Sequence, residues 1–112
     1  MTQPVNFYYD VASPYSYLAA SRINGVGEKA GVTVVWKPIL LGGIFHATGN
    51  TMPAAVPARG QYLAKDLVRW AERDGIPFQF SSSFPHNSLL AMRALTAADS
   101  PAVIPISTAL FR

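Results

Sequence analysis

The chain has 112 residues, of which 50% are hydrophobic, so it can bury one core and form one domain at most. Its net charge of +3 comes from scattered Lys and Arg residues without interleaved aromatics, which excludes a basic stripe or a base-stacking platform for nucleic acid. It has no cysteine, which excludes disulfides, thiolate metal sites and cysteine nucleophiles.

The first third of the chain predicts a strand, a helix and a second strand. Val5–Tyr9 is a bulky aromatic run typical of a buried strand. Helical spacing follows and ends at Gly31, although two glycines inside the helix, Gly25 and Gly27, should loosen its last turns. Val32–Trp36 is β-branched and predicts a second strand. This order predicts a right-handed parallel βαβ unit.

The middle of the chain changes character. Ile39–Phe45 is apolar, and the Gly-, Pro- and Ala-rich stretch that follows to Gly60 predicts a long irregular loop, a type of segment that is often functional. Gln61–Asp74 then predicts an amphipathic helix. Its apolar face comprises Leu63, Leu67, Trp70 and Ala71.

The last third predicts a linker and two short helices. The linker includes the serine run 81–83, and Asn87 or Ser88 should cap a helix that continues to Ala98. A second helix begins near Pro101, with Ile106, Leu110 and Phe111 on one side. The sequence stops at Arg112 within this apolar pattern, and two parallel strands leave most pairing groups unsatisfied. We therefore expect the front part of a larger domain.

The turn between the first strand and the helix carries the candidate chemistry. Ser13-Pro14 suits a helix start, with Ser13 as N-cap and Pro14 at the first helical position. A helix N-terminus favours an anion, and a free thiol has a pKa of about 8.5, so a hydroxyl at a helix end would suffice to ionise a bound thiol. The alternative is that Ser13 only caps the helix.

The sequence around this turn resembles a known family. The run F-Y-x-D-V-x-S-P-Y-S-Y-L, Phe7–Leu18, resembles the opening motif of the DsbA-like glutathione enzymes, which are 2-hydroxychromene-2-carboxylate isomerases and kappa-class glutathione transferases. The likeness continues in order through further motifs: L-L-G-G-I-F at Leu40–Phe45, G-N at Gly49-Asn50, Y-L-x-x-D-L-x-R-W-A at Tyr62–Ala71, G-I-P-F at Gly75–Phe78 and A-M-R-A-L at Ala91–Leu95.

The resemblance implies three residues of a glutathione site. The serine that matches Ser13 hydrogen-bonds the glutathione sulfur, and the asparagine that matches Asn50 lies at the glutathione site in the loop after the second strand. Arg59 falls near a basic position that contacts ligand. The alternatives are that Asn50 is an ordinary turn residue and that Arg59 is a solvated loop charge. No metal is expected, because His46 and His86 are far apart and fit no ligand pattern.

The resemblance also implies an α/β fold of thioredoxin-like, DsbA-like type, with a βαβ unit followed by the start of a helical insertion. We expect residues 1–60 to form the N-terminal thioredoxin-like half with the ligand loop, and residues 61–112 to form a truncated insertion. The second half of the fold, with its cis-proline and γ-glutamyl anchor, is expected to be absent. A truncated gene product or a deliberate truncation would explain this.

The function implied is a glutathione-dependent isomerase of 2-hydroxychromene-2-carboxylate type, in aromatic-compound degradation, with glutathione as cofactor and an aromatic small molecule as substrate. The alternatives are a kappa-class-like glutathione transferase and a non-catalytic thioredoxin-like fragment. A homodimer is expected for the full-length form. No signal peptide or membrane-length apolar stretch is visible, so we expect a cytoplasmic protein without membrane or nucleic-acid partners.

Overall fold

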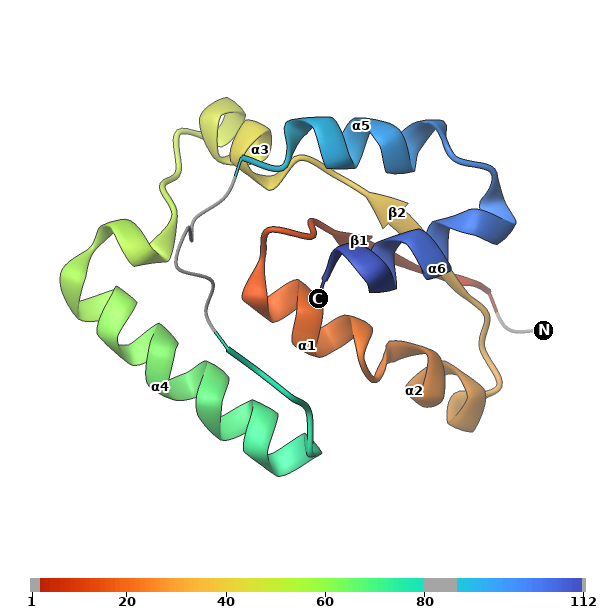
Figure 1. Cartoon of the computed structure of the whole chain (residues 1–112), viewed down its shortest axis with the longest axis horizontal. Helices are drawn as coiled ribbons and strands as arrows, with labels where there is room; N and C mark the ends of the chain where they lie inside the picture. Colours follow the sequence, from red (N-terminus) through yellow and green to blue (C-terminus); the bar gives the residue numbers. More distant parts are fainter. Residues whose placement is uncertain (1–2, 80–86, 112) are drawn as a thin grey trace. The chain divides into compact units, whose positions relative to one another are not determined.

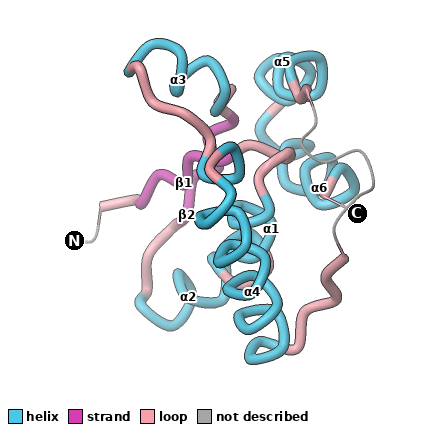
Figure 2. Tube along the Cα trace, turned by 90° about the vertical axis from the view of Figure 1, so that its left-hand side faces the viewer, coloured by secondary structure: helices cyan, strands magenta, loops and turns pink. Residues whose placement is uncertain are grey.

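A parallel pair of strands forms the sheet of this computed structural model, which describes residues 3–79 and 87–111 (Figure 1). Strand β1 (Val5–Tyr9) pairs with β2 (Val34–Pro38) in a register that sets Val5 opposite Val34 and Tyr9 opposite Pro38. Figures 1 and 2 both show the two strands side by side. The predicted strand–helix–strand order is confirmed, although β2 begins two residues later than expected.

Six α-helices and one 3₁₀ helix accompany the strands in the described residues. They are α1 (Pro14–Ala20), α2 (Ile23–Ala30), α3 (Leu41–Thr48), the 3₁₀ helix η1 (Pro53–Ala55), α4 (Pro57–Asp74), α5 (Leu89–Ala97) and α6 (Ser100–Leu110). The chain divides into two compact units, residues 1–40 with 85–112 and residues 41–84. The expected boundary between residues 60 and 61 falls inside α4, and the compact units divide the chain at other places.

The single helix predicted from Pro14 to Gly31 is wrong, because the helix is interrupted at Ser21 and Arg22. The break lies before both glycines, so these do not cause it. Gly31 does end α2 as predicted, in the left-handed region at φ 68°. The amide of Gly31 bonds the carbonyl of Glu28, which gives a carbonyl of the last turn a partner.

The long irregular loop predicted for residues 46–60 is also wrong as a continuous loop. Helix α3 extends into it as far as Thr48, η1 lies within it, and α4 begins at Pro57 rather than at Gln61. Gly60 lies within α4, where an ideal Cβ would come within 3.3 Å of the Ala54 carbonyl oxygen. Gly60 is therefore a close-packing residue between η1 and α4 and not a loop glycine.

The core of the first unit lies on one face of the strand pair. Tyr9 and Trp36 from the strands are buried together with Met92 and Leu95 from α5. The Phe7 ring stacks on the Tyr9 ring with centroids 5.3 Å apart and meets the Trp36 ring edge-on at 5.2 Å. The face of the strand pair that carries Phe7, Tyr9 and Trp36 is therefore the face that packs against α5.

Helix α6 contacts this core through a different stripe from the one predicted. Val103 and Phe111 pack against the core cluster, and Ser107 between them is fully buried. The Ser107 hydroxyl is hydrogen-bonded to the Tyr9 hydroxyl at 2.5 Å. The predicted stripe is right for Phe111 and wrong for Ile106 and Leu110, which are exposed.

Helix α4 buries most of the face that the sequence predicts. Leu63, Leu67 and Ala71 are buried, but Trp70 is 38% exposed and lies under the Arg73 guanidinium, 4.9 Å from the ring centroid.

The start of α5 is capped by Asn87, one of the two expected residues. The amide of Leu89, the first residue of α5, donates to the Asn87 side-chain oxygen. The serine run 81–83 and His86 lie outside the described residues.

Candidate functional site

The turn from β1 to α1 holds Ser13 through hydrogen bonds to Asp10, which is buried at the end of the strand. The Asp10 side chain accepts the amide proton of Ala12 at 2.9 Å, and the Asp10 carbonyl accepts that of Ser13 at 2.9 Å. The Asp10 amide in turn donates to the Ser16 hydroxyl at 3.4 Å. These bonds fix the backbone of the turn and thereby the position of Ser13.

Ser13 is the N-cap of α1, as predicted. Its hydroxyl oxygen accepts the amide proton of Ser16 at 3.2 Å, and Pro14 occupies the first turn. Capping uses a lone pair of the hydroxyl oxygen and leaves its proton available, since a hydroxyl both donates and accepts. No acceptor for this proton lies among residues 3–79 and 87–111. The two interpretations of Ser13, helix cap and ligand donor, are therefore compatible in one half-buried side chain.

The end of α1 contributes less to this site than the sequence predicts. The helix has seven residues instead of a run to Gly31, so fewer peptide dipoles add at its N-terminus. Pro14 has no N–H, and the N–H of Ser16 is bonded to Ser13. The Ser13 hydroxyl is thus a group at this turn that can donate a hydrogen bond to an anionic atom.

Asn50 lies two residues after the end of α3. Gly49 adopts φ 70°, a conformation that favours glycine, and the Asn50 amide donates to the Phe45 carbonyl at 2.9 Å. The Asn50 side-chain oxygen accepts the amide proton of Thr51 at 2.8 Å. The side chain is exposed, and its NH₂ group has no acceptor among the described residues, so Asn50 is a turn residue that keeps two donors for a ligand.

Arg59 lies in the first turn of α4, whereas the sequence predicts a loop at this position. A cation is unfavourable there, by about 0.3–1 kcal/mol, because the N-terminal end of a helix carries a partial positive charge. Arg59 is exposed and forms no ion pair with a described residue. Helix stability therefore does not explain an arginine at this position, and its exposure is compatible with both a ligand contact and a solvated charge.

The three predicted site residues belong to both compact units. Ser13 is part of the first unit, and Asn50 and Arg59 are part of the second.

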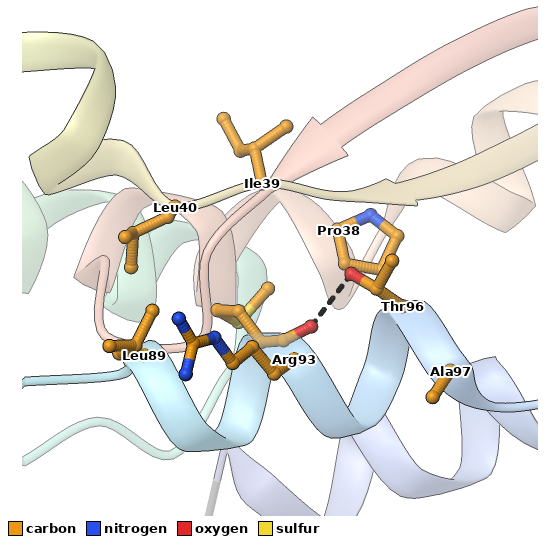
Figure 3. Close-up of a pocket in the computed structure, with 8 residues that line it drawn as sticks. Pro38, Ile39, Leu40, Leu89, Arg93, Thr96 and Ala97 are labelled. Atoms are coloured by element: carbon orange, nitrogen blue, oxygen red, sulfur yellow. Dashed lines mark hydrogen bonds between the residues drawn. The ribbon is translucent and has the colours of Figure 1, made fainter.

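The first unit also contains a pocket that the sequence does not predict, between the end of β2 and α5 (Figure 3). Arg93 lines this pocket and belongs to the A-M-R-A-L motif. The motif is the only feature of the sequence that points to this arginine, and it does not indicate a pocket or a role for the side chain.

Residues 4–111, nearly the whole chain, match the DSBA-like thioredoxin domain. The chain belongs to this family. The assignment agrees with a solved structure of 2-hydroxychromene-2-carboxylate isomerase, to which this DsbA-like domain is similar with a TM-score of 0.81 and 28% sequence identity. That comparison covers 98% of this chain and 54% of the other, so the predicted thioredoxin-like α/β class is confirmed.

The curated relatives of this DsbA-like domain include isomerases and kappa-type glutathione transferases. A 2-hydroxychromene-2-carboxylate isomerase from Pseudomonas putida is 37% identical over 82 residues, which are 71% of this chain and 40% of the relative. Human glutathione S-transferase kappa 1 is 33% identical over 104 residues, which are 88% of this chain and 46% of the relative. The chain thus spans less than half the length of the curated relatives it matches, and those relatives are named as enzymes.

Two negative findings apply to the residues that the structure describes. None of the helices there combines the length and the apolar character needed to cross a membrane. Within the same residues, no three His, Asp or Glu side chains are grouped closely enough to hold a metal ion.

Proposed function

We propose that this DsbA-like domain is the thiol-activating part of a glutathione-dependent isomerase of 2-hydroxychromene-2-carboxylate type, which acts in the degradation of aromatic compounds. The observation that carries the proposal is the Ser13 hydroxyl, which caps α1 with its oxygen and keeps its proton for an acceptor. The names of the relatives supply the reaction class, and the opening motif of the sequence supplies glutathione.

Each of the three predicted residues offers a hydrogen-bond donor that suits one kind of group in glutathione. A thiolate needs a hydrogen-bond donor, and Ser13 offers one in a turn held by Asp10. The tripeptide has carbonyl and carboxylate groups, for which the Asn50 amide and the Arg59 guanidinium are suitable partners. When bound, glutathione would supply a thiolate that adds to the substrate, permits bond rotation and leaves again.

The role of Ser13 follows from the energy of one hydrogen bond. A bond to a charged group contributes about 1.5–3 kcal/mol, and each pKa unit corresponds to about 1.4 kcal/mol. Donation from Ser13 to the thiolate would therefore lower the pKa of the bound thiol by about 1 to 2 units from about 8.5. That change brings the pKa of the bound thiol to about 6.5–7.5, so a substantial fraction of it is thiolate near neutral pH.

The test is a pH titration of bound glutathione, followed by thiolate absorbance, in the 112-residue chain and in full-length relatives that carry the same turn. Ser13→Ala should raise the pKa of the bound thiol by about 1 to 2 units. Ser13→Thr keeps both the cap and the donor and should behave like the parent. Ser13→Asp keeps the capping oxygen but cannot donate when ionised, so the thiolate should be lost while α1 stays folded.

Calorimetry with S-methylglutathione is the matched ligand control. It has no thiol, so Ser13→Ala should leave its affinity unchanged while the affinity for glutathione falls. Equal losses for both ligands would show that the substitution disturbs the turn. A thiol pKa that is the same in the parent and in Ser13→Ala would reduce Ser13 to a helix cap.

Arg59 and Asn50 make separate contributions in this proposal. Arg59→Ala should weaken glutathione binding and flatten its dependence on salt, because a screened charge is removed. Arg69→Ala, on an exposed part of the same helix, is the control and should change neither. Asn50→Ala should weaken binding without altering the salt dependence, since an amide carries no charge. Affinity that is flat with salt in the parent would contradict the role of Arg59.

A kappa-class-like transferase is the second candidate, favoured by the match to human glutathione S-transferase kappa 1 over 88% of this chain. Both candidates use the same Ser13 hydrogen bond and differ in the fate of glutathione. An isomerase regenerates it, whereas a transferase consumes one molecule per conjugate. Counting free glutathione after turnover of 2-hydroxychromene-2-carboxylate by the full-length protein distinguishes them. Failure of a folded chain to bind glutathione would instead favour a non-catalytic domain.

A further inference from the structure

We infer that the pocket between the end of β2 and α5 binds an apolar molecule that carries one carboxylate, with Arg93 as the partner of that carboxylate. The pocket has a volume of about 300 Å³ and lies entirely within the first compact unit (Figure 3). Its lining consists of Pro38, Ile39, Leu40, Leu89, Met92, Arg93, Thr96 and Ala97.

The walls determine the body of the ligand. The chain after β2 contributes only apolar side chains, and α5 adds Leu89, Met92 and Ala97 from the other side. A volume of about 300 Å³ is at the lower end of the range in which proteins hold small molecules. Such walls favour a compact apolar or aromatic body, whose transfer from water is favourable and which needs no hydrogen-bond partner.

The polar groups determine the charge of the ligand. Thr96 donates its hydroxyl proton to the Met92 carbonyl at 2.8 Å, so that proton is already used. Arg93 is exposed and has no ion pair or hydrogen bond with a described residue. Figure 3 shows its guanidinium on the side of α5 that carries Leu89, below Leu40. A guanidinium offers paired N–H donors that match the two oxygens of a carboxylate.

The position of the pocket in the fold also favours a ligand site. Tyr9 and Pro38 end the two parallel strands opposite each other, and the Ile39 amide donates to the Tyr9 carbonyl at 2.9 Å. The pocket therefore lies at the carboxyl edge of the strand pair, the edge at which parallel sheets bind ligands. It shares no lining residue with the Ser13 turn, so it can be occupied without glutathione, and the inference does not rest on the proposed function.

The experiment compares two probes of the same shape in the 112-residue chain without glutathione. These are 2-naphthoate and its neutral amide, 2-naphthamide, titrated by calorimetry and by amide NMR shifts. We expect 2-naphthoate to bind about tenfold more tightly, because a charge-assisted bond is added to the same apolar contact. The largest shifts should fall on the pocket residues Leu40, Arg93 and Ala97.

Three variants test the assignment. Arg93→Gln should reduce the affinity for 2-naphthoate to that for 2-naphthamide and leave the amide unaffected. Arg69→Gln, an exposed arginine in the other compact unit, is the matched control and should change neither affinity. Ala97→Phe, at an exposed lining position, should fill the pocket and weaken both probes.

Several outcomes would overturn the inference. Equal affinities for the two probes, or binding of 2-naphthoate that Arg93→Gln does not change, would remove the role of the arginine. If neither probe binds to a folded chain, the pocket is not a binding site for apolar molecules of this size. Loss of 2-naphthoate binding in Ser13→Ala would locate the ligand at the Ser13 turn instead. Ser13→Ala that binds 2-naphthoate normally but not glutathione would keep this site separate from the proposed enzymatic one.

Discussion

Gly27 lies where α2 comes against the chain that leads into β2, and it is buried. An ideal Cβ at this position would lie 2.7 Å from a methyl carbon of Val34 and 2.9 Å from the Val32 carbonyl oxygen. Glycine is thus required by close approach of the backbones. Its φ is not positive, so the conformational freedom of glycine has no part in this requirement. The sequence-based interpretation that Gly27 only weakens the helix misses this contact.

Gly27→Ala and Gly25→Ala should have opposite effects on stability. At Gly25 no atom lies within 4 Å of an ideal Cβ, so alanine should stabilise by about 0.5–1 kcal/mol through helix propensity. At Gly27 overpacking, which costs about 1–3 kcal/mol, should outweigh that gain and destabilise the protein. Denaturant unfolding of both variants measures this. Stabilisation by Gly27→Ala would mean that α2 can move away from Val34.

Tyr9 links stability to alkaline pH. Burial raises the pKa of the Tyr9 hydroxyl above 10.0, and the hydrogen bond with Ser107 offsets part of that increase. The unfolded chain therefore loses this proton at lower pH than the folded chain. The contribution of the protonated Tyr9 hydroxyl to the free energy of unfolding is complete below pH 10 and is lost as pH rises above that value. The free energy of unfolding of the parent should fall above pH 10 more steeply than that of Tyr9→Phe, measured against urea.

The residue-level features that sequence analysis predicts correctly are those with partners nearby in the chain. Ser13, Pro14 and the glycine end of α2 follow local rules, and each is found as predicted. Ser107 was not predicted, because its partner Tyr9 is 98 residues away and a serine in a helical pattern normally marks the exposed side. Asn50 and Arg59 as ligand residues stay predictions.

At the scale of elements, α6 shows how a polar residue can misdirect a pattern. Ser107 interrupts the apolar series, so the stripe through Ile106 and Leu110 looks continuous, while the buried one runs through Val103 and Phe111. The two stripes are separated by one position along the helix. The hydroxyl bond to Tyr9 allows a serine in the buried stripe, since a buried polar group is tolerated once it is paired.

Val103→Ala and Ile106→Ala distinguish the two stripes by their cost. Val103 packs against the core cluster, so removal of two methyl groups should destabilise by about 1–2 kcal/mol. Ile106 is 39% exposed, so Ile106→Ala should reduce the free energy of unfolding by clearly less, although this substitution removes more atoms. Thermal unfolding of the pair decides between them. A larger cost at Ile106 would restore the predicted stripe.

Helices α3 and α4 show why composition alone misidentifies helix starts. The glycine, proline and alanine content of residues 46–60 is typical of a loop and predicts one there, although α3, η1 and α4 occupy parts of this stretch. Pro57, however, occupies the first helical turn, where its missing N–H costs nothing. The rule that identified Pro14 correctly applies equally to Pro57.

For the whole molecule, the outer edge of β1 is the feature with the largest consequence. Val5 donates to Thr33, and Tyr9 accepts from Ile39, so the odd-numbered residues of β1 face β2. The backbone groups of Asn6 and Tyr8 therefore point to the other edge, where no described strand pairs with them. Val5 and Tyr8 are also exposed, at 47% and 60%. An open edge with apolar side chains favours pairing with another chain.

We predict that the 112-residue chain is unstable or self-associates through this edge. Asn6→Pro removes only an outward N–H and should reduce the concentration-dependent increase in mass seen by sedimentation. Phe7→Pro is the control, because it removes a donor that faces β2 and should disrupt the fold. A chain that sediments as a monomer at all concentrations and unfolds in one sharp transition would contradict the prediction.

The bond between Tyr9 and Ser107 also determines the order in which the chain can fold during synthesis. At about 5–20 residues per second, the 98 residues between these positions take about 5–20 s to be translated. For most of that interval the core around Tyr9 and Trp36 lacks α5, and it lacks α6 until the end. Residues 41–84 form a compact unit that is continuous in sequence, so this unit can complete its own contacts while the flanking one is still waiting for its last helix.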